Sequence, residues 1–411
     1  MADDVARHDL RAPLTAAGVV VVDVTGAPAQ CGAGYGAAAA GLIADNVDRY
    51  LRRFRDEAGL SRAAVRVAGG TFRNASRAVH PRVTDMLDGL AEGAGVHVDE
   101  IYALNARTEL LYGTRPPAAP GHPDGADGGC TAAGVLGSHA VDGHLLLGQN
   151  WDWHPDQRDT MVVLRTVDER GDAVLTLAEA GMLAKTGLNS AGLGVCVNML
   201  GTDRDGLSAG RTPGVPYHVL LRAVLEAGSL GQATRVACRT PRNASINLLL
   251  GQAGPGGGEL LDLEVVPGDV GWLHPADGVL THANHLESAL AVRDTMKDLG
   301  GSSLFRSARA RRLLVDRTGR GPVGLDALAD VFHDHLGLPL AICRHLDERD
   351  APADQAETVH SVLLDLDSRR LGLAAGPPCR HDYQWLELTG DRDVSAAAPR
   401  VPAATTDQAR N

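Results

Sequence analysis

Residues 127–155 read DGGCTAAGVLGSHAVDGHLLLGQNWDWHP, and the rest of the chain can be arranged around them. Two apolar runs flank Asp142 and Gly143. An Asp-Gly pair between apolar runs is typical of a hairpin, because a tight turn needs a positive φ that glycine tolerates. Antiparallel strands joined there would bring Cys130 beside Asp152 at the end of the second strand. A thiol that follows two glycines and faces a carboxylate is a candidate reactive centre.

The composition indicates a globular protein. The chain has 411 residues, 44% hydrophobic and 22% charged, enough for two or three domains or one large layered domain. A net charge of −12 argues against a nucleic-acid partner. We find no apolar stretch long enough to cross a membrane and no Sec-type signal. The six cysteines form no C-x-x-C pair, which favours reduced thiols and a cytoplasmic location.

Many short strands with grouped helices predict an α+β fold, with antiparallel sheets flanked by helices instead of βαβ units. Helices are predicted at 37–57, 83–94, 98–112, 217–227, 231–239, 303–316 and 325–336. Strands are predicted at 18–24, 161–167, 173–178, 244–251, 259–266, 270–273, 279–282, 357–367, 370–374 and 383–388, with a strand-turn-strand unit over 186–198.

The segment 113–129 has four prolines and five glycines and cannot form a core. It can be interpreted as a flexible interdomain linker. Alternatively, it ends in a cleavable bond between Gly129 and Cys130. Composition alone favours the linker.

Cys130 would need a base, because a thiolate attacks a carbonyl far better than a thiol. Cleavage before Cys130 would free its own α-amine, whose pKa of roughly 7.7–8.0 suits that task. Gly129 would ease self-cleavage, because it lacks a Cβ and admits strained backbone angles. The competing interpretation is a small buried cysteine at the start of a strand.

Seven segments in order carry a resemblance to a known family: ALNARTE (103–109), GCT (129–131), GQNWDW (148–153), EAGMLAKTGLNSAGLGVCVN (179–198), RTPGVPYHVLLRAVLE (211–226), THANH (281–285) and ICR (342–344). The chain resembles the penicillin acyltransferase-type N-terminal nucleophile (Ntn) hydrolases. The resemblance implies a four-layer αββα fold of two antiparallel sheets flanked by helices. It also implies a precursor that cuts itself before Cys130, so that residues 1–129 and 130–389 form one domain. Residues 390–411 are expected to be a disordered tail.

The resemblance assigns roles to five residues. Cys130 matches the nucleophile, and its α-amine would be the general base. Asp152 matches the carboxylate that holds the amine, Asn284 matches an oxyanion-hole donor, and Arg344 matches an arginine beside the thiol. Ser245 matches a serine linked to processing. Taken singly, Asp152 could be a strand-end cap, Asn284 a turn residue and Arg344 part of a surface ion pair.

The expected function is transfer of an acyl or aminoacyl group from an amide, peptide or thioester to an amine or to water. Hydrolysis and transfer remain alternatives, and a catalytically inactive binding or scaffold protein is a third. Ala132 stands where the fungal enzyme of the family has a hydroxyl, which puts a penicillin substrate in doubt. No cofactor is expected, and no metal, because His139, His144 and His154 lack a compact ligand spacing. The expected partner is the chain's own second fragment, with no nucleic acid and no membrane.

Overall fold

A computed structural model describes residues 15–113, 129–207, 213–298, 301–351 and 355–388. Residues 1–14, residues 114–128 of the predicted linker, and the predicted tail lie outside the described residues. Within them, none of the helices combines the length and the apolar character that a membrane span requires.

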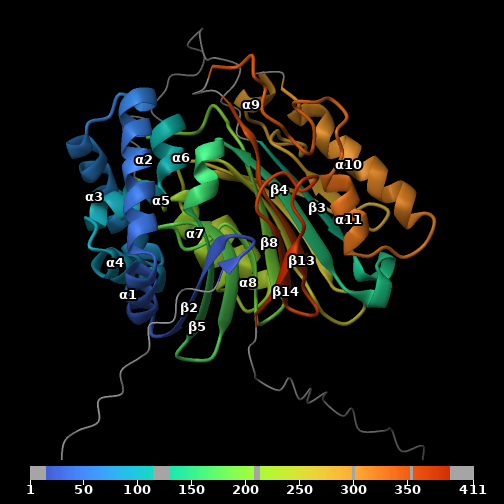
Figure 1. Cartoon of the computed structure of the whole chain (residues 1–411), viewed down its shortest axis with the longest axis horizontal. Helices are drawn as coiled ribbons and strands as arrows, with labels where there is room; N and C mark the ends of the chain where they lie inside the picture. The colour runs from blue at the N-terminus through green and yellow to red at the C-terminus, as the bar shows by residue number, and fades with distance from the viewer. Residues whose placement is uncertain (1–14, 114–128, 208–212, 299–300, 352–354, 389–411) are drawn as a thin grey trace, which may run out of the picture.

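Two sheets form the centre of the molecule (Figure 1). The first has nine strands in the order β1-β2-β5-β6-β7-β8-β9-β10-β11, and the second has six in the order β12-β3-β4-β13-β14-β15. The strands are β1 (Thr15–Ala16), β2 (Val19–Gly26), β3 (Cys130–Val135), β4 (Leu146–Trp153), β5 (Met161–Asp168), β6 (Ala173–Glu179), β7 (Thr186–Asn189), β8 (Leu193–Met199), β9 (Ile246–Gln252), β10 (Glu259–Val266), β11 (Asp269–Leu273), β12 (Val279–His282), β13 (Glu357–Asp365), β14 (Arg370–Ala374) and β15 (Gln384–Glu387).

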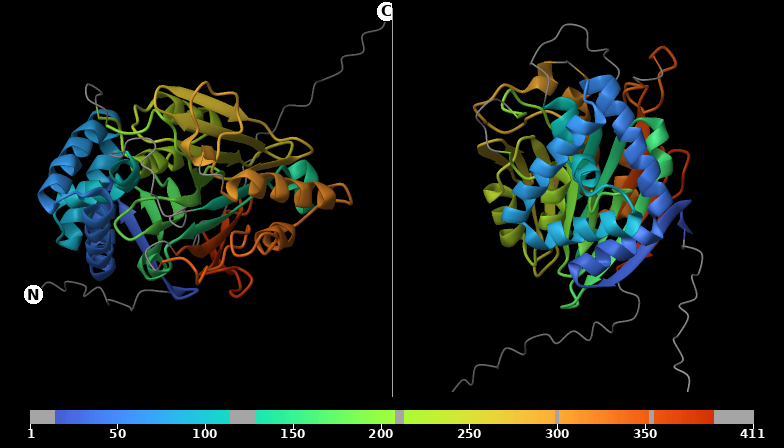
Figure 2. Two further views of the ribbon diagram at one scale, coloured as in Figure 1. Left: turned by 90° about the horizontal axis from the view of Figure 1, so that it is seen from above. Right: turned by 90° about the vertical axis from the view of Figure 1, so that its left-hand side faces the viewer.

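Helices cover the outer face of each sheet (Figures 1 and 2). The first sheet is covered by α1 (Pro28–Ala38), α2 (Ala40–Ala58), α3 (Arg62–Val79), α4 (Pro81–Ala94), α5 (Val98–Asn105), α6 (Arg107–Tyr112), α7 (Tyr217–Leu225) and α8 (Leu230–Arg239). The second is covered by α10 (Ser303–Thr318) and α11 (Leu325–Phe332), and a short α9 (Thr295–Asp298) precedes them.

Alternation along the strands fills the space between the sheets. In β5, Val163 faces the second sheet, whereas Val162 and Leu164 pack under the helices. In β4, Leu147 points between the sheets and Leu146 points to the outer helices. This period of two is what a strand buried on both faces requires. The predicted four-layer αββα architecture is therefore confirmed.

The pairing of β3 with β4 is confirmed, with Cys130 opposite Trp151. The turn is longer than a two-residue hairpin, because the strands end at Val135 and Leu146 and short 3₁₀ turns connect them. Within this connection Asp142 and Gly143 do have positive φ angles, 62° and 73°.

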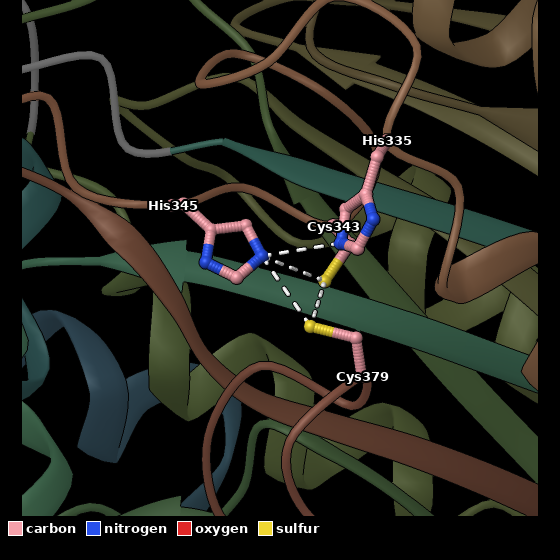
Figure 3. Close-up of side chains that lie close together, drawn as sticks. All are labelled: His335, Cys343, His345 and Cys379. Atoms are coloured by element: carbon pink, nitrogen blue, oxygen red, sulfur yellow. Dashed lines mark hydrogen bonds between the residues drawn. The ribbon is translucent and has the colours of Figure 1, made fainter.

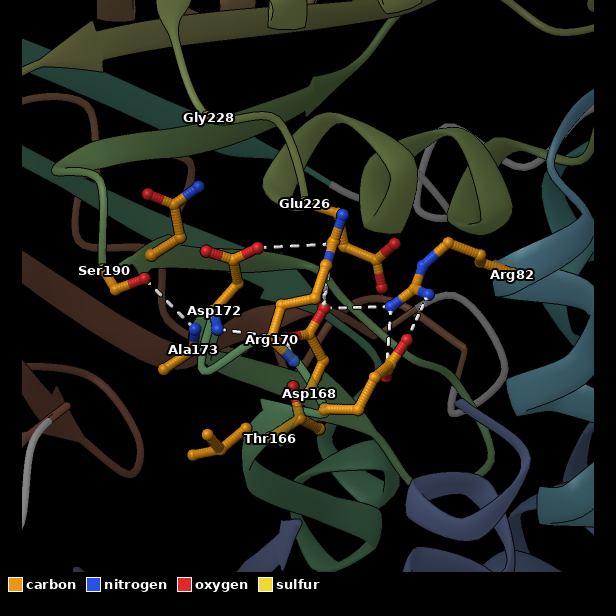
Figure 4. Close-up of polar contacts among 12 residues, drawn as sticks. Arg82, Thr166, Asp168, Arg170, Asp172, Ala173, Ser190, Glu226 and Gly228 are labelled. Atoms are coloured by element: carbon orange, nitrogen blue, oxygen red, sulfur yellow. Dashed lines mark hydrogen bonds and ion pairs between the residues drawn. The ribbon is translucent and has the colours of Figure 1, made fainter. Parts of the chain in front are cut away.

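The strands predicted at 161–167 and 173–178 are present as the antiparallel pair β5–β6, and Figure 4 shows the turn between them. The Asp168 carboxylate accepts hydrogen bonds from the backbone N–H groups of Arg170 (2.8 Å) and Asp172 (3.0 Å). Arg82 of α4 also donates to Asp168, at 2.9 Å. The turn is thus attached to the helical layer.

Two expectations need correction. The first sheet is mixed, because β2 pairs in parallel with β5 while its other pairs are antiparallel. The helix predicted over 98–112 is broken at Ala106 into α5 and α6.

Helices α1 and α4 pack with their backbones in contact. A Cβ added at Gly32 or Gly36 of α1 would collide with a carbonyl oxygen of α4, and one at Gly89 or Gly93 of α4 would collide with a carbonyl oxygen of α1. Four glycines therefore permit this close approach, although glycine disfavours a helix by about 1 kcal/mol relative to alanine.

We expect Gly32→Ala to lower the free energy of unfolding by about 1–3 kcal/mol, because the added methyl group forces the two helices apart. Gly41→Ala is the matched control, since a Cβ at this exposed position of α2 meets nothing within 4 Å. The control should be neutral or stabilising by up to about 1 kcal/mol. Denaturation followed by circular dichroism compares the two, and an equal response of both would contradict the packing argument.

Candidate active site

Cys130 begins β3 and lies in the core between the sheets, with 5% of its surface exposed. It lines a small cavity with residues from both sheets and from the helical layer. The other lining residues are Arg107, Thr108, Trp151, Asp152, Trp153, Lys185, Val197, Met199 and Tyr217. The cavity offers about 20 Å³, little more than one water molecule occupies. In the uncut chain the thiol is therefore closed off from any sizeable substrate.

The peptide bond before Cys130 is held on both sides. The backbone N–H of Asp152 donates to the Gly129 carbonyl oxygen at 2.7 Å, and the Gly129 N–H donates to the Asp152 carbonyl at 3.1 Å. The Cys130 N–H donates to Oδ1 of Asn284 at 2.8 Å. The carbonyl oxygen and the amide nitrogen of this bond thus each have a fixed partner.

Arg306 of α10 fixes the next peptide group. Its guanidinium donates to the Cys130 carbonyl oxygen at 2.6 Å, to Oγ1 of Thr131 at 2.7 Å and to Oδ1 of Asn284 at 2.7 Å. Only 3% of Arg306 is exposed, so a full positive charge lies against the candidate nucleophile.

The Asp152 carboxylate faces the same bond. Its Oδ1 accepts from Oγ1 of Thr358 at 2.7 Å, whereas Oδ2 has no hydrogen-bond partner among the described residues. A Cβ added at Gly129 would lie 2.7 Å from Oδ2, so this oxygen is directed at the junction and leaves no room for a side chain. Burial raises the pKa of Asp152 to about 6, although Arg306 and Arg344 oppose the shift.

The Cys130 thiol is protonated at neutral pH in this arrangement. Burial and the nearby Asp152 raise its pKa to about 11, while Lys185, Arg306 and the backbone N–H of Met199 favour the thiolate. A base must therefore remove the thiol proton before the sulfur can attack.

A buried charge cluster lies next to the thiol. Nζ of Lys185 is 3.3 Å from the centre of the Trp151 ring and donates to Glu179 at 3.0 Å. Glu179 also contacts Arg107 at 3.1 Å and accepts from Tyr50 at 2.7 Å. Burial alone would raise the pKa of Glu179, but Arg107 and Lys185 hold it well below its ordinary value. Burial lowers the pKa of Lys185 to about 8.

The structure places Asn284 at the Cys130 nitrogen. Its Nδ2 donates to the Met199 carbonyl at 3.0 Å, so in the uncut chain the amide is engaged with backbone groups. The oxyanion-donor role stays a prediction.

Arg344 is buried, and its charge acts on Asp152. The cations that act most strongly on Cys130 are Lys185 and Arg306. The predicted position of Arg344 beside the thiol stays a prediction.

Ser245 is not among the residues that line the cavity. It is buried and bonds to Asp205 and, at 3.0 Å, to Oγ1 of Thr202. Its link to processing also stays a prediction.

Sequence analysis did not identify Arg306, Lys185 or Glu179 as site residues. Lys185 and Glu179 do lie in the quoted segment 179–198, and a charged pair within an otherwise apolar run was the available signal. Arg306 belongs to the arginine-rich helix 303–318, and nothing in the sequence separates it from its exposed neighbours.

We expect Arg306→Met to slow cleavage before Cys130 and to destabilise the fold by about 2–4 kcal/mol, because three oxygens lose a charged donor inside the core. Arg311→Met on the same helix is the control, since Arg311 pairs at the surface with Asp277 and should change stability by less than about 0.5 kcal/mol. Cleavage time courses and thermal midpoints measure both effects. If the two variants have the same cleavage rate and the same thermal midpoint, Arg306 has no role in the site.

Comparison with known proteins identifies the family of the chain. Residues 139–379, more than half of the chain, match the acyl-coenzyme A:6-aminopenicillanic acid acyl-transferase family. The acyl-coenzyme A:6-aminopenicillanic-acid-acyltransferase 40 kDa form of Emericella nidulans is 26% identical over 380 residues, which cover 92% of this chain and 98% of that protein.

Solved structures show more distant likenesses. Penicillin V acylase from Agrobacterium tumefaciens has 13% identity and a TM-score of 0.42, over 63% of this chain and 86% of that one. A variant of conjugated bile acid hydrolase from Clostridium perfringens has 14% identity and a TM-score of 0.44, over 63% and 92%. On the family match, the chain belongs to the acyl-coenzyme A:6-aminopenicillanic acid acyl-transferase family.

Proposed function

We propose that the chain cleaves its own Gly129–Cys130 bond and then uses Cys130 as an N-terminal nucleophile in amide-bond acyl transfer or hydrolysis. The observation that supports the proposal most directly is the fixation of this bond. The Asp152 N–H donates to the carbonyl oxygen of this bond, and the N–H of the bond donates to Oδ1 of Asn284. Oδ2 of Asp152, which has no hydrogen-bond partner within the described parts of the chain, faces it.

The first step is attack of Sγ of Cys130 on the Gly129 carbonyl carbon. The thiol proton passes to the Asp152 carboxylate, and the Asp152 N–H donates to the oxyanion that forms on the carbonyl oxygen. The carbon–nitrogen bond then breaks, and the nitrogen takes up a proton and becomes the free amine of Cys130. Water hydrolyses the resulting thioester, which leaves the Gly129 carboxylate and a free thiol.

After cleavage the new amine would serve as the base for the thiol of the same residue. Free α-amines have pKa values of roughly 7.7–8.0, so part of the population is neutral at physiological pH. Asn284 Oδ1 already contacts this nitrogen and would hold the amine. A substrate acyl group would then form a thioester at Cys130 and pass to an amine or to water.

The two fragments would remain together as a heterodimer. Strand β2 comes from residues before the cut, and it pairs along seven residues with β5 from the other fragment. Separation would break this ladder and expose the core under α1–α6. The cut therefore frees a chain end without dividing the domain.

The substrate class follows from the family. The Emericella relative is named as an acyltransferase that acts with acyl-coenzyme A and 6-aminopenicillanic acid, so transfer from a thioester or amide to a small amine is proposed here. The two competing outcomes are distinguished by supplying an amine and identifying the product as an acid or a new amide. We place this activity in the cytoplasm, since all six cysteines are unpaired.

The chain should appear on denaturing electrophoresis as fragments 1–129 and 130–411, and Cys130→Ala should remain intact because no nucleophile is left. Cys238→Ala is the matched control, since Cys238 is an exposed free thiol away from the cavity, and it should be cut as in the unmodified protein. Mass spectrometry locates the new N-terminus. An uncut chain with full acyl-transfer activity would disprove the proposal and indicate catalysis without an N-terminal nucleophile.

Cleavage should depend on pH through Asp152, whose raised pKa of about 6 refers to the uncut chain. The carboxylate must be ionised to take the thiol proton, so the rate should be constant above that pKa and fall about tenfold per pH unit below it. Chain made by cell-free translation and shifted to different pH values provides the measurement. Asp152→Asn should be slow and should lose this dependence, and an unmodified chain with a flat profile between about pH 5 and 7 would exclude Asp152 as the acceptor.

A further inference from the structure

Four metal-binding side chains converge outside the cavity of Cys130 (Figure 3). They are His335, Cys343, His345 and Cys379, and their ligand atoms all lie within 4.8 Å of one another. The two sulfurs are 3.6 Å apart, and Nε2 of His345 lies 3.6 Å from Sγ of Cys343 and 3.4 Å from Sγ of Cys379. The Nε2 atoms of His335 and His345 are 3.2 Å apart.

These separations match the edges of a tetrahedron around a zinc ion. With Zn–S bonds of about 2.3 Å and Zn–N bonds of about 2.0–2.1 Å, tetrahedral geometry requires about 3.8 Å between sulfurs, about 3.5 Å between sulfur and nitrogen and about 3.4 Å between nitrogens. Cys343 and Cys379 are separate thiols, since a disulfide would need its sulfurs at about 2.05 Å.

We propose that His335, Cys343, His345 and Cys379 form a structural Cys₂His₂ site for Zn²⁺. Two thiolates and two imidazoles are the donor set that zinc takes in closed tetrahedral sites, and the protein supplies all four positions. Binding releases the two thiol protons, and the two thiolates neutralise the charge of the ion.

The site would join two loops that β13 and β14 separate in the sequence. His335 follows α11, Cys343 and His345 lie in the connection to β13, and Cys379 lies between β14 and β15. The connection from α11 to β13 contains no helix or strand in the part that the structure describes. A metal ion that closes a long irregular loop stabilises the folded protein most, because it removes the conformational entropy of the open loop.

The metal would also position the active site. Arg344 lies between two of the ligands, and its backbone N–H donates to Oγ1 of Thr358 at 2.9 Å, while its carbonyl accepts from the Thr358 N–H at 3.0 Å. Thr358 in turn donates to Asp152 at 2.7 Å. The ligand loop is thus two hydrogen bonds from the carboxylate that faces the Gly129–Cys130 bond. The proposed metal site itself does not depend on the proposed reaction.

Elemental analysis of the full chain, purified without chelator or supplied with Zn²⁺ and desalted, tests the proposal. We expect about one tightly held Zn²⁺ per chain, the same content in Cys130→Ala, and a lower thermal midpoint after removal of the metal by a strong chelator. Co²⁺ in place of zinc should give the visible absorption of a tetrahedral thiolate complex.

Cys379→Ser and His335→Gln should reduce the zinc content to background, and both ligands are exposed, so the fold should tolerate the changes. Cys238→Ser and His274→Gln are matched exposed controls and should keep the metal. A chain that retains no zinc after reconstitution, a native Cys343–Cys379 disulfide found by non-reducing mass spectrometry, or equal metal loss in ligand and control variants would each overturn the proposal. The zinc content is also measured in Cys130→Ala, which cannot cleave itself. The metal result can therefore be interpreted even if self-cleavage does not occur.

Discussion

The pairing of β3 with β4 is the constraint on which the site depends. This ladder places Cys130 opposite Trp151 and continues one step beyond the strand, where Gly129 and Asp152 exchange two backbone hydrogen bonds. Backbone hydrogen bonds are not lost when a side chain changes its rotamer. The sheet itself therefore fixes the peptide bond before Cys130. The absence of a side chain at Gly129 completes the arrangement, because any Cβ there would contact the Asp152 carboxylate.

The surrounding charges follow from burial at this position. A thiol and a carboxylate enclosed between two sheets both favour their neutral forms, which is why the pKa values of Cys130 and Asp152 rise together. Arg306 of α10 opposes this tendency at both groups, Lys185 before β7 opposes it at Cys130, and Arg344 opposes it at Asp152. Opposite charges therefore lie close together around a cavity of about 20 Å³, where electrostatic effects are stronger than in water.

The sequence predicts those parts of the molecule that depend on local pattern. Strand alternation and the Asp-Gly pair are local, so the β3–β4 pairing was predicted. Helix α1 was missed, because PAQCGAGYGAA has little amphipathic pattern and its four-glycine contact with α4 exists only in the folded protein. The parallel pairing of β2 with β5 was missed for a similar reason, since its partners are separated by about 140 residues and by six helices.

The site residues also fall into those that the sequence identifies and those that only tertiary packing reveals. Cys130 and Asp152 were selected from the hairpin pattern and the resemblance, and Asn284 and Arg344 by the resemblance alone. The structure joins Gly129 and Cys130 to Asp152 and Asn284 by hydrogen bonds, and it joins the Arg344 backbone to Asp152 through Thr358. Arg306 could not be selected, because its helix carries several arginines and only tertiary packing decides which one is buried. The metal ligands were missed too, since the search considered other histidines, and Cys379 joins the three ligands of the α11–β13 connection only in the folded protein.

A single carboxylate serves both stages of the proposed reaction. In the uncut chain Asp152 faces a neutral peptide group, and burial leaves it with a raised pKa, which suits an acceptor for the thiol proton. After the cut, a positively charged amine would replace that peptide nitrogen, and a neighbouring opposite charge stabilises a carboxylate in its ionised form. Asp152 would then hold and orient the amine instead of accepting a proton. In the proposed reaction, the chemical change at Cys130 would thus convert the same side chain from a base into a counter-ion.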